Sequence, residues 1–171
     1  MTLQKILITL LLSVCIFQFN YAQDIIIPQN VKLKSEADYK NFETDVLNCI
    51  NWLEKTPINK HTAMRARANT FLIQWATGTP FVTIDMQSFQ VDVTKKNASL
   101  LMTFIGGWVK HALENPTKNI SKLEGNIAGF QSLIKVYSNN KTSGIKKDKR
   151  LEKLLKMDVS ELTNWISEKL K

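Results

Sequence analysis

Apolar residues recur every three or four positions along most of the chain after residue 35, which is the spacing of one face of an α-helix. Capping residues and prolines divide this pattern into separate helical segments. The expected helices cover residues 35–55, 59–76, 98–113, 117–137, 147–157 and 158–170. Short connections between such helices predict an all-α fold, a single bundle-like domain of five to six helices.

Several of the expected helices begin at a residue whose side chain can accept a hydrogen bond from the first turn. Ser35 is followed three positions later by Asp38, close to the capping-box pattern. Asn59 and Asn97 precede the second and third helices, and Asp158 precedes the last one. These residues set the expected helix boundaries.

Residues 79–96 break the helical rhythm and form an insertion in the bundle. Residues 81–85 and 89–93 alternate loosely between apolar and polar, so either short strands or an irregular loop fit the pattern. Long irregular segments in compact domains are often binding loops. Asp85 and Asp92 are therefore candidate carboxylates for metal binding or acid–base work. The simpler interpretation is a loop whose apolar side chains cover the bundle.

Residues 1–22 have the organisation of a secretory signal peptide. Lys5 supplies a positive charge, residues 6–19 form an apolar run, and Ala22 offers a small residue for cleavage. The run is shorter than the roughly 20 residues that span a bilayer. We expect cleavage after Ala22, a secreted or periplasmic location, and a single helical domain over 23–171 without a transmembrane segment.

The two cysteines have different settings. Cys15 lies inside the apolar run, but a lipoprotein signal needs a small residue before the modified cysteine, and Val14 stands there. Lipidation, or retention of the segment as a membrane anchor, is therefore the lesser alternative. Cys49 shares an apolar helical stripe with its neighbours and is expected to be buried and reduced.

The charge balance restricts the class of partner. The chain carries 23 basic and 15 acidic residues, and removing Lys5 with the signal leaves an excess of 22 − 15 = 7. A basic excess favours an anionic partner. Few of these residues are Arg, whose guanidinium group forms paired hydrogen bonds with bases and phosphates, so the composition disfavours nucleic acid as the ligand. An anionic envelope or surface polymer is the better candidate.

Much of this charge is concentrated in residues 141–156, a short basic amphipathic helix with the loop before it. The basic residues there are Lys141, Lys146, Lys147, Lys149, Arg150, Lys153 and Lys156. Helices of this kind can bind an anionic surface. The candidate ligand-binding residues are Lys146, Lys147, Lys149 and Lys153. The alternative is a solvated helix that buries only its leucines.

His111 is the remaining candidate for chemistry. It lies three residues before Glu114, on the neighbouring turn of one helix. A zinc site needs three or four protein ligands, and neither a second His nor a thiolate pair lies on that helix. No catalytic motif is recognisable, although catalytic triads also assemble from distant residues. The sequence therefore predicts no metal, no cofactor and no assigned catalytic residue.

Four glycines interrupt the third and fourth helices and need a physical reason, because glycine costs about 1 kcal/mol relative to alanine inside a helix. An antiparallel hairpin about Pro116 would place Gly106 opposite Gly125, with Gly107 and Gly129 nearby. Close packing of two backbones is the favoured explanation. A ligand cleft lined by bare backbone is the alternative.

Together these features favour a small secreted or periplasmic helical protein that binds a partner without catalysis. One alternative is a hydrolase-type enzyme with a site between the 79–96 loop and the third helix. Such an enzyme would need a pocket with several perturbed titratable groups. Another is a carrier of an apolar ligand, which would need a large closed cavity.

Overall fold

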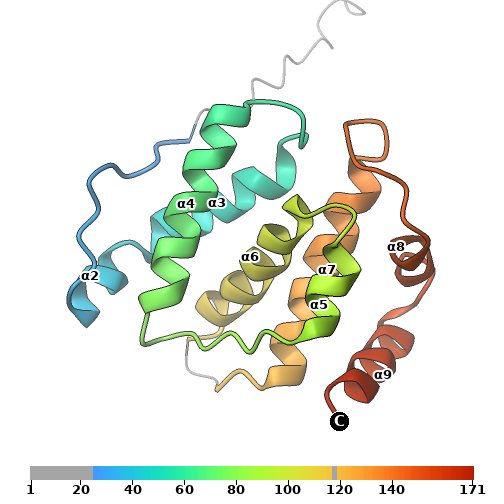
Figure 1. Ribbon diagram of the computed structural model, residues 1–171. Coiled ribbons are helices and arrows are strands. Elements are labelled where there is room, and N and C mark those ends of the chain that lie inside the picture. The colour runs from blue at the N-terminus through green and yellow to red at the C-terminus, as the bar shows by residue number, and fades with distance from the viewer. Residues whose placement is uncertain (1–24, 117–118) are drawn as a thin grey trace, which may run out of the picture.

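The computed structural model describes residues 25–116 and 119–171, and this part of the chain is all-helical, as predicted. It contains eight helices and no strand, so both the expected count of five to six helices and the short-strand insertion are wrong (Figure 1). The helices are α2 (Glu36–Asn41), α3 (Glu43–Lys55), α4 (Thr62–Gly78), α5 (Ser88–Thr94), α6 (Ser99–Glu114), α7 (Lys122–Asn139), α8 (Lys149–Leu154) and α9 (Val159–Lys169). The predicted signal peptide, with its cleavage after Ala22, lies outside the described residues.

The first expected helix is divided into α2 and α3. The Ser35 side chain accepts a hydrogen bond from the Asp38 amide, and the Asp38 carboxylate accepts one from Ser35, so the predicted capping box is present. Phe42 then leaves helical geometry, with φ −99° and ψ 2°, and serves as the end of α2 and the start of α3. The apolar stripe continues across this break, which explains why periodicity alone suggested one helix.

The insertion at 79–96 consists of an extended run followed by the short helix α5. A capping box between Gln87 and Gln90 starts α5. Of the two segments that suggested strands, residues 81–85 lie in the extended run and residues 89–93 lie in α5. The latter are at helical spacing, since Phe89 and Val93 face the core while Val91 is 48% exposed. Alternation of apolar residues over so short a segment does not distinguish a strand from one amphipathic turn.

The core is built around the antiparallel pair α6 and α7, which form the most extensive helix–helix contact in the described chain. Helices α3 and α4 cover one side of this pair, and α8 and α9 lie on the other side, against α7 (Figure 1). Large side chains that are fully buried between these layers include Leu72, Trp75, Phe104, Trp108, Phe130, Leu133 and Tyr137.

The glycines allow α6 and α7 to approach closely, as predicted, but in a different register. A Cβ atom added to Gly107 would lie 2.7 Å from the Ala128 carbonyl oxygen and 3.1 Å from the Gly129 Cα atom. Gly125 lies under the indole ring of Trp108. The expected pairing of Gly106 with Gly125 is wrong, because Gly106 faces Ile50 and Leu72 on α3 and α4 instead.

Three expected helix starts also differ from the structure. Helix α4 begins after His61, which has a left-handed conformation (φ 50°), and not at Asn59. Asn97 does not cap α6; it is buried and bonds to a distant segment. The fourth helix, expected from residue 117, begins at Lys122 with Ser121 as its cap. By contrast, Asp158 caps the last helix as expected, and it does so in a capping box with Glu161.

Candidate functional site

The basic segment 141–156 is held against α7 by apolar and polar contacts. Leu151 and Leu154 of α8 are 0% and 3% exposed and belong to the core. The Tyr137 hydroxyl, at the end of α7, donates to the Glu152 carboxylate at 2.7 Å and accepts from the Asp148 amide at 3.2 Å. Burial is the main cause that raises the pKa of the Tyr137 phenol. The backbone of the segment therefore has a fixed position on the bundle.

Both acidic residues of the segment, Asp148 and Glu152, form ion pairs with basic residues of the same segment. Asp148 caps α8 through the Arg150 amide at 2.8 Å and forms an ion pair with the Arg150 guanidinium at 3.1 Å. Glu152 pairs with Lys141 at 2.9 Å. The Arg150 side chain is the main cause that lowers the pKa of Asp148, and hydrogen bonds from Lys141 and then Tyr137 lower that of Glu152. These carboxylates are therefore ionised and already paired at neutral pH.

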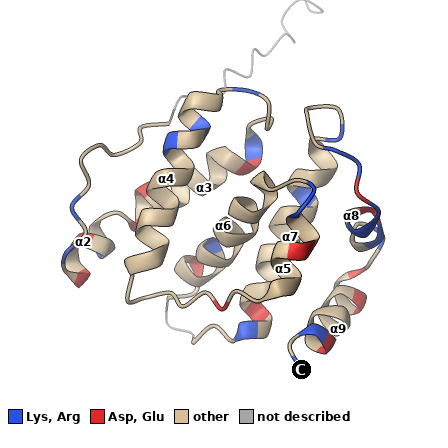
Figure 2. Ribbon diagram, in the orientation of Figure 1, with Lys and Arg blue, Asp and Glu red and all other residues tan. Residues whose placement is uncertain are grey.

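The four candidate lysines of this segment remain exposed and outside the ion pairs of the described chain. Lys146, Lys147, Lys149 and Lys153 are all exposed, and none lies within ion-pair distance of an acidic group in the part of the chain described. Figure 2 shows the resulting run of basic residues along α8 and the loop that leads to it. We call these four lysines the basic face.

Two residues outside segment 141–156, Asn97 and Lys96, hold the backbone at the start of the basic face. The sequence pattern did not identify either residue as part of the site. The buried Asn97 side chain donates to the Lys146 carbonyl and accepts from the Lys146 amide, both at 2.8 Å. Lys96 donates to the Lys147 carbonyl at 2.5 Å. This pairing spans 49 to 51 positions of the sequence, and no local pattern indicates it.

Asp85 holds the 79–96 segment in place on α7. Its carboxylate forms an ion pair with Lys122, the first residue of α7. The next contact is made one turn further along α7, where the Asn126 side chain accepts a hydrogen bond from Gln90 at 2.9 Å. The Asn126 side chain also donates to the Lys122 carbonyl. These buried amides each have partners, which is typical of a structural network. The structure therefore agrees with the interpretation of a loop that covers the bundle.

Asp92 and His111 do not join Asp85 in a common site. Asp92 is exposed on α5, whereas His111 is partly buried near the end of α6. The Nε2 atom of His111 is buried without a hydrogen-bond partner in the described structure. Across residues 25–116 and 119–171, no three His, Cys, Asp or Glu side chains are grouped so that they could hold a metal ion.

A shallow apolar groove lies between α7 and the junction of α8 and α9. Its volume is about 220 Å³ and it is open to solvent. The residues that line it are Gln131, Ile134, Lys135, Leu154, Met157, Asp158, Val159 and Leu162. Small-molecule sites usually enclose about 300–1,000 Å³. This groove is therefore smaller and more open than the cavity that a carrier of an apolar ligand would need.

In the part of the chain that the structure describes, no helix is both long and apolar enough to cross a membrane.

Comparisons with known protein families, with curated proteins and with solved structures found no match for this chain. The chemistry of the surface therefore gives the indication of function, and the basic face is the most distinctive part of that surface.

Proposed function

We propose that this chain is a secreted or periplasmic binding protein, without catalytic activity, whose basic face binds an anionic polymer of the cell envelope or surface. The observation that carries the proposal is that four lysines are exposed and form no ion pair in the described chain: Lys146, Lys147, Lys149 and Lys153. A surface of one sign attracts ligands of the opposite sign and raises their local concentration.

The buried leucines of α8 favour a polymer over a lipid bilayer as the ligand. A helix that lies in a membrane interface inserts an apolar face between the lipids. In α8 that face, Leu151 and Leu154, is already buried in the core, and the helix has only 6 residues. What remains accessible is the charged side, which suits a hydrated polyanion.

The arginines favour a ligand other than nucleic acid. Arg65 donates to the carbonyl groups of Leu53 and Thr56 at the end of α3, and Arg150 is paired with Asp148. Arg67 is exposed on α4 and is not part of the basic segment. Recognition of bases and phosphates relies on free guanidinium groups, which the basic face does not offer.

Titration of the protein with dextran sulfate, a linear polyanion, tests the proposal. Isothermal titration calorimetry at several salt concentrations should give an affinity that falls as salt rises, because surface charges are screened. The variant Lys149→Glu/Lys153→Glu should lose most of this binding, since it reverses two lysines of α8. Its matched control is Lys32→Glu/Lys34→Glu, which changes the net charge by the same amount.

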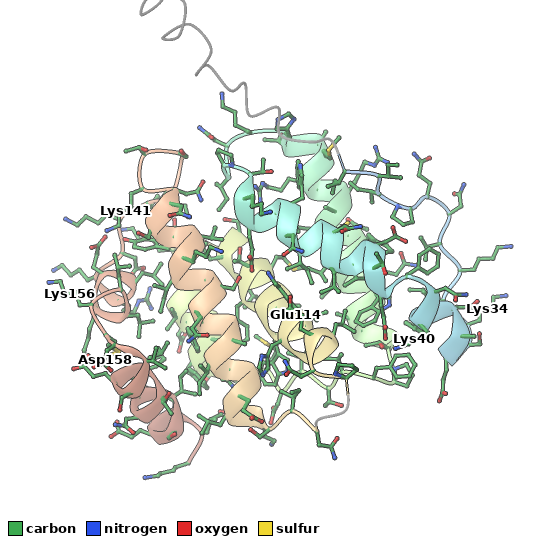
Figure 3. All side chains as sticks on the ribbon, turned by 180° about the vertical axis from the view of Figure 1, so that it is seen from behind. Lys34, Lys40, Glu114, Lys141, Lys156 and Asp158 are labelled. Carbon is green, nitrogen blue, oxygen red and sulfur yellow. The ribbon has the colours of Figure 1, made fainter. Side chains whose placement is uncertain are left out.

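The control is informative because of its position. Figure 3 places Lys34 on the side of the molecule opposite to Lys141 and Lys156. If both double variants lose binding equally, net charge alone explains the interaction and the proposed face is wrong. Equal binding by the wild type and the α8 variant would also contradict it. Retention on phosphatidylglycerol vesicles without affinity for dextran sulfate would indicate a membrane ligand instead.

A further inference from the structure

The basic face does not end at residue 146, because the end of α5 lies directly against it. Asn97 is bonded to both backbone groups of Lys146, and the Lys96 side chain reaches the Lys147 carbonyl. Figure 2 shows the basic end of α5 beside the basic loop before α8. Two segments that are far apart in sequence therefore present lysines on one continuous surface.

Lys96 keeps most of its binding capacity in this position. A lysine ammonium group has three hydrogen-bond donors, and the Lys147 carbonyl uses one of them. A carbonyl is neutral, so the positive charge of Lys96 is not cancelled. Lys96 is exposed and forms no ion pair within the described chain. Two donors and a full charge are available to a ligand.

Asp92 brings an opposing charge to the same edge. It is exposed on α5, one turn before Lys96. The charge of Asp92 acts on α8. The pKa of Arg150 is raised mainly by the hydrogen bond from the Arg150 side chain to Asp148, and the charge of Asp92 raises it further. Lys96 likewise adds a small part to the lowered pKa of Asp148, after the larger effect of Arg150. Asp92 on α5 and Lys96 in the turn after it therefore lie near Arg150 and Asp148, which alternate in sequence with the lysines of the basic face.

We infer that the ligand is a linear polyanion that crosses from α8 onto the turn after α5, where Lys96 binds it and Asp92, at the end of α5, weakens its binding. This inference rests on the proposed function and deepens it. A polymer restricted to α8 would contact only one segment, whereas one that crosses the junction meets lysines from both. Asp92 then acts as a specificity determinant, because it disfavours a high density of negative charge at the α5 end.

Single substitutions of Lys96 and Asp92 test this inference with the same dextran sulfate titration. For nucleic-acid polyanions, each ionic contact adds about 0.7–0.9 to the slope of log affinity against log salt. Lys96→Gln should reduce that slope by about one such contact and weaken binding. Asp92→Asn should strengthen binding several-fold at low salt. Lys34→Gln, on the opposite side of the molecule, should change neither quantity.

Lys96→Arg separates the charge of this residue from its structural contact. The arginine keeps the positive charge, so it should retain the slope that Lys96→Gln loses. If Lys96→Gln behaves like Lys34→Gln while the α8 double variant still loses binding, the inference is overturned and the proposed function stands. If Asp92→Asn weakens binding, the specificity role is wrong. If the wild type does not bind at all, both proposals fail.

Discussion

The side chain of Asn97 pairs with the backbone of Lys146 through two hydrogen bonds of 2.8 Å, because it accepts from the Lys146 amide and donates to the Lys146 carbonyl. Asn97 is 8% exposed, so water does not readily replace these bonds. They connect the start of α6 to the loop before α8, and thereby set the position of the first lysine of the basic face.

Replacing Asn97 with alanine should therefore destabilise the fold. Both backbone groups of Lys146 would lose their partner, and each of these part-buried hydrogen bonds contributes about 0.5–1.5 kcal/mol. Urea unfolding followed by circular dichroism measures this loss. Asn48→Ala, at an exposed position of α3, is the control and should change the free energy of unfolding by less than about 0.5 kcal/mol. Equal effects of the two substitutions would contradict the role of Asn97.

The neighbouring glycines of α6 provide a matched pair of substitutions with opposite expectations. Gly107→Ala places a Cβ atom 2.7 Å from the Ala128 carbonyl oxygen, so the helices must separate. Such overpacking typically costs about 1–3 kcal/mol. At Gly106 the nearest atom would be 3.4 Å away, in the Ile50 side chain. Gly106→Ala should be neutral or stabilising by up to about 1 kcal/mol, because alanine favours helix.

Thermal melts of both variants measure the difference. A lower melting temperature for Gly107→Ala than for Gly106→Ala would support the close crossing of α6 and α7. The reverse order would show that the two helices do not meet through Gly107. Because the two positions are adjacent in one helix, differences in intrinsic helix propensity do not affect the comparison.

Cys49 should be unreactive in the folded protein. Its side chain is fully buried in α3, and burial, followed by the nearby charge of Asp45, raises the pKa of the thiol to about 11. The thiolate is the reactive form, so both access and ionisation are unfavourable. Labelling with a maleimide near neutral pH should be slow, and it should become fast in denaturant. Fast labelling of the folded protein would show that α3 opens readily.

Local patterns predicted the helices well where capping and periodicity act over a few residues. Ser35 and Asp158 start helices as expected, and Cys49 is buried with its stripe. Asn97 was misassigned as a helix cap because its true partner, Lys146, is 49 positions away. The register of the α6–α7 pair could not be predicted from local sequence patterns either. It depends on how the rings of Trp108 and Phe104 pack over Gly125 and Gly129.

The candidate site shows the same limit. The sequence identified Lys146, Lys147, Lys149 and Lys153 from their density along the chain. It did not reveal that Asp148 and Glu152 are already paired, which depends on side-chain geometry within α8 and on Tyr137. It grouped Asp85 with Asp92 by proximity in sequence, whereas contacts place Asp85 at Lys122 on α7.

The free energy of unfolding should fall in acid as the Asp148 carboxylate becomes protonated. Its pKa is lowered chiefly by Arg150, so the folded form holds the charged carboxylate more strongly than the unfolded chain does. The stabilisation is complete above the unfolded pKa of about 4 and is lost as pH falls through the lower, folded value. Asp148→Asn keeps a side chain that can cap α8 but removes the charge.

The wild type should therefore exceed Asp148→Asn in free energy of unfolding at neutral pH, and the difference should shrink as the pH falls below about 4. Urea unfolding at a series of pH values measures both proteins in parallel. Asp45→Asn, on α3, provides a carboxylate control outside this network. A difference between wild type and Asp148→Asn that stays constant down to acid pH would mean that charge on Asp148 does not hold the segment. The position of the basic face would then depend on Asn97, Tyr137 and the buried leucines of α8 alone.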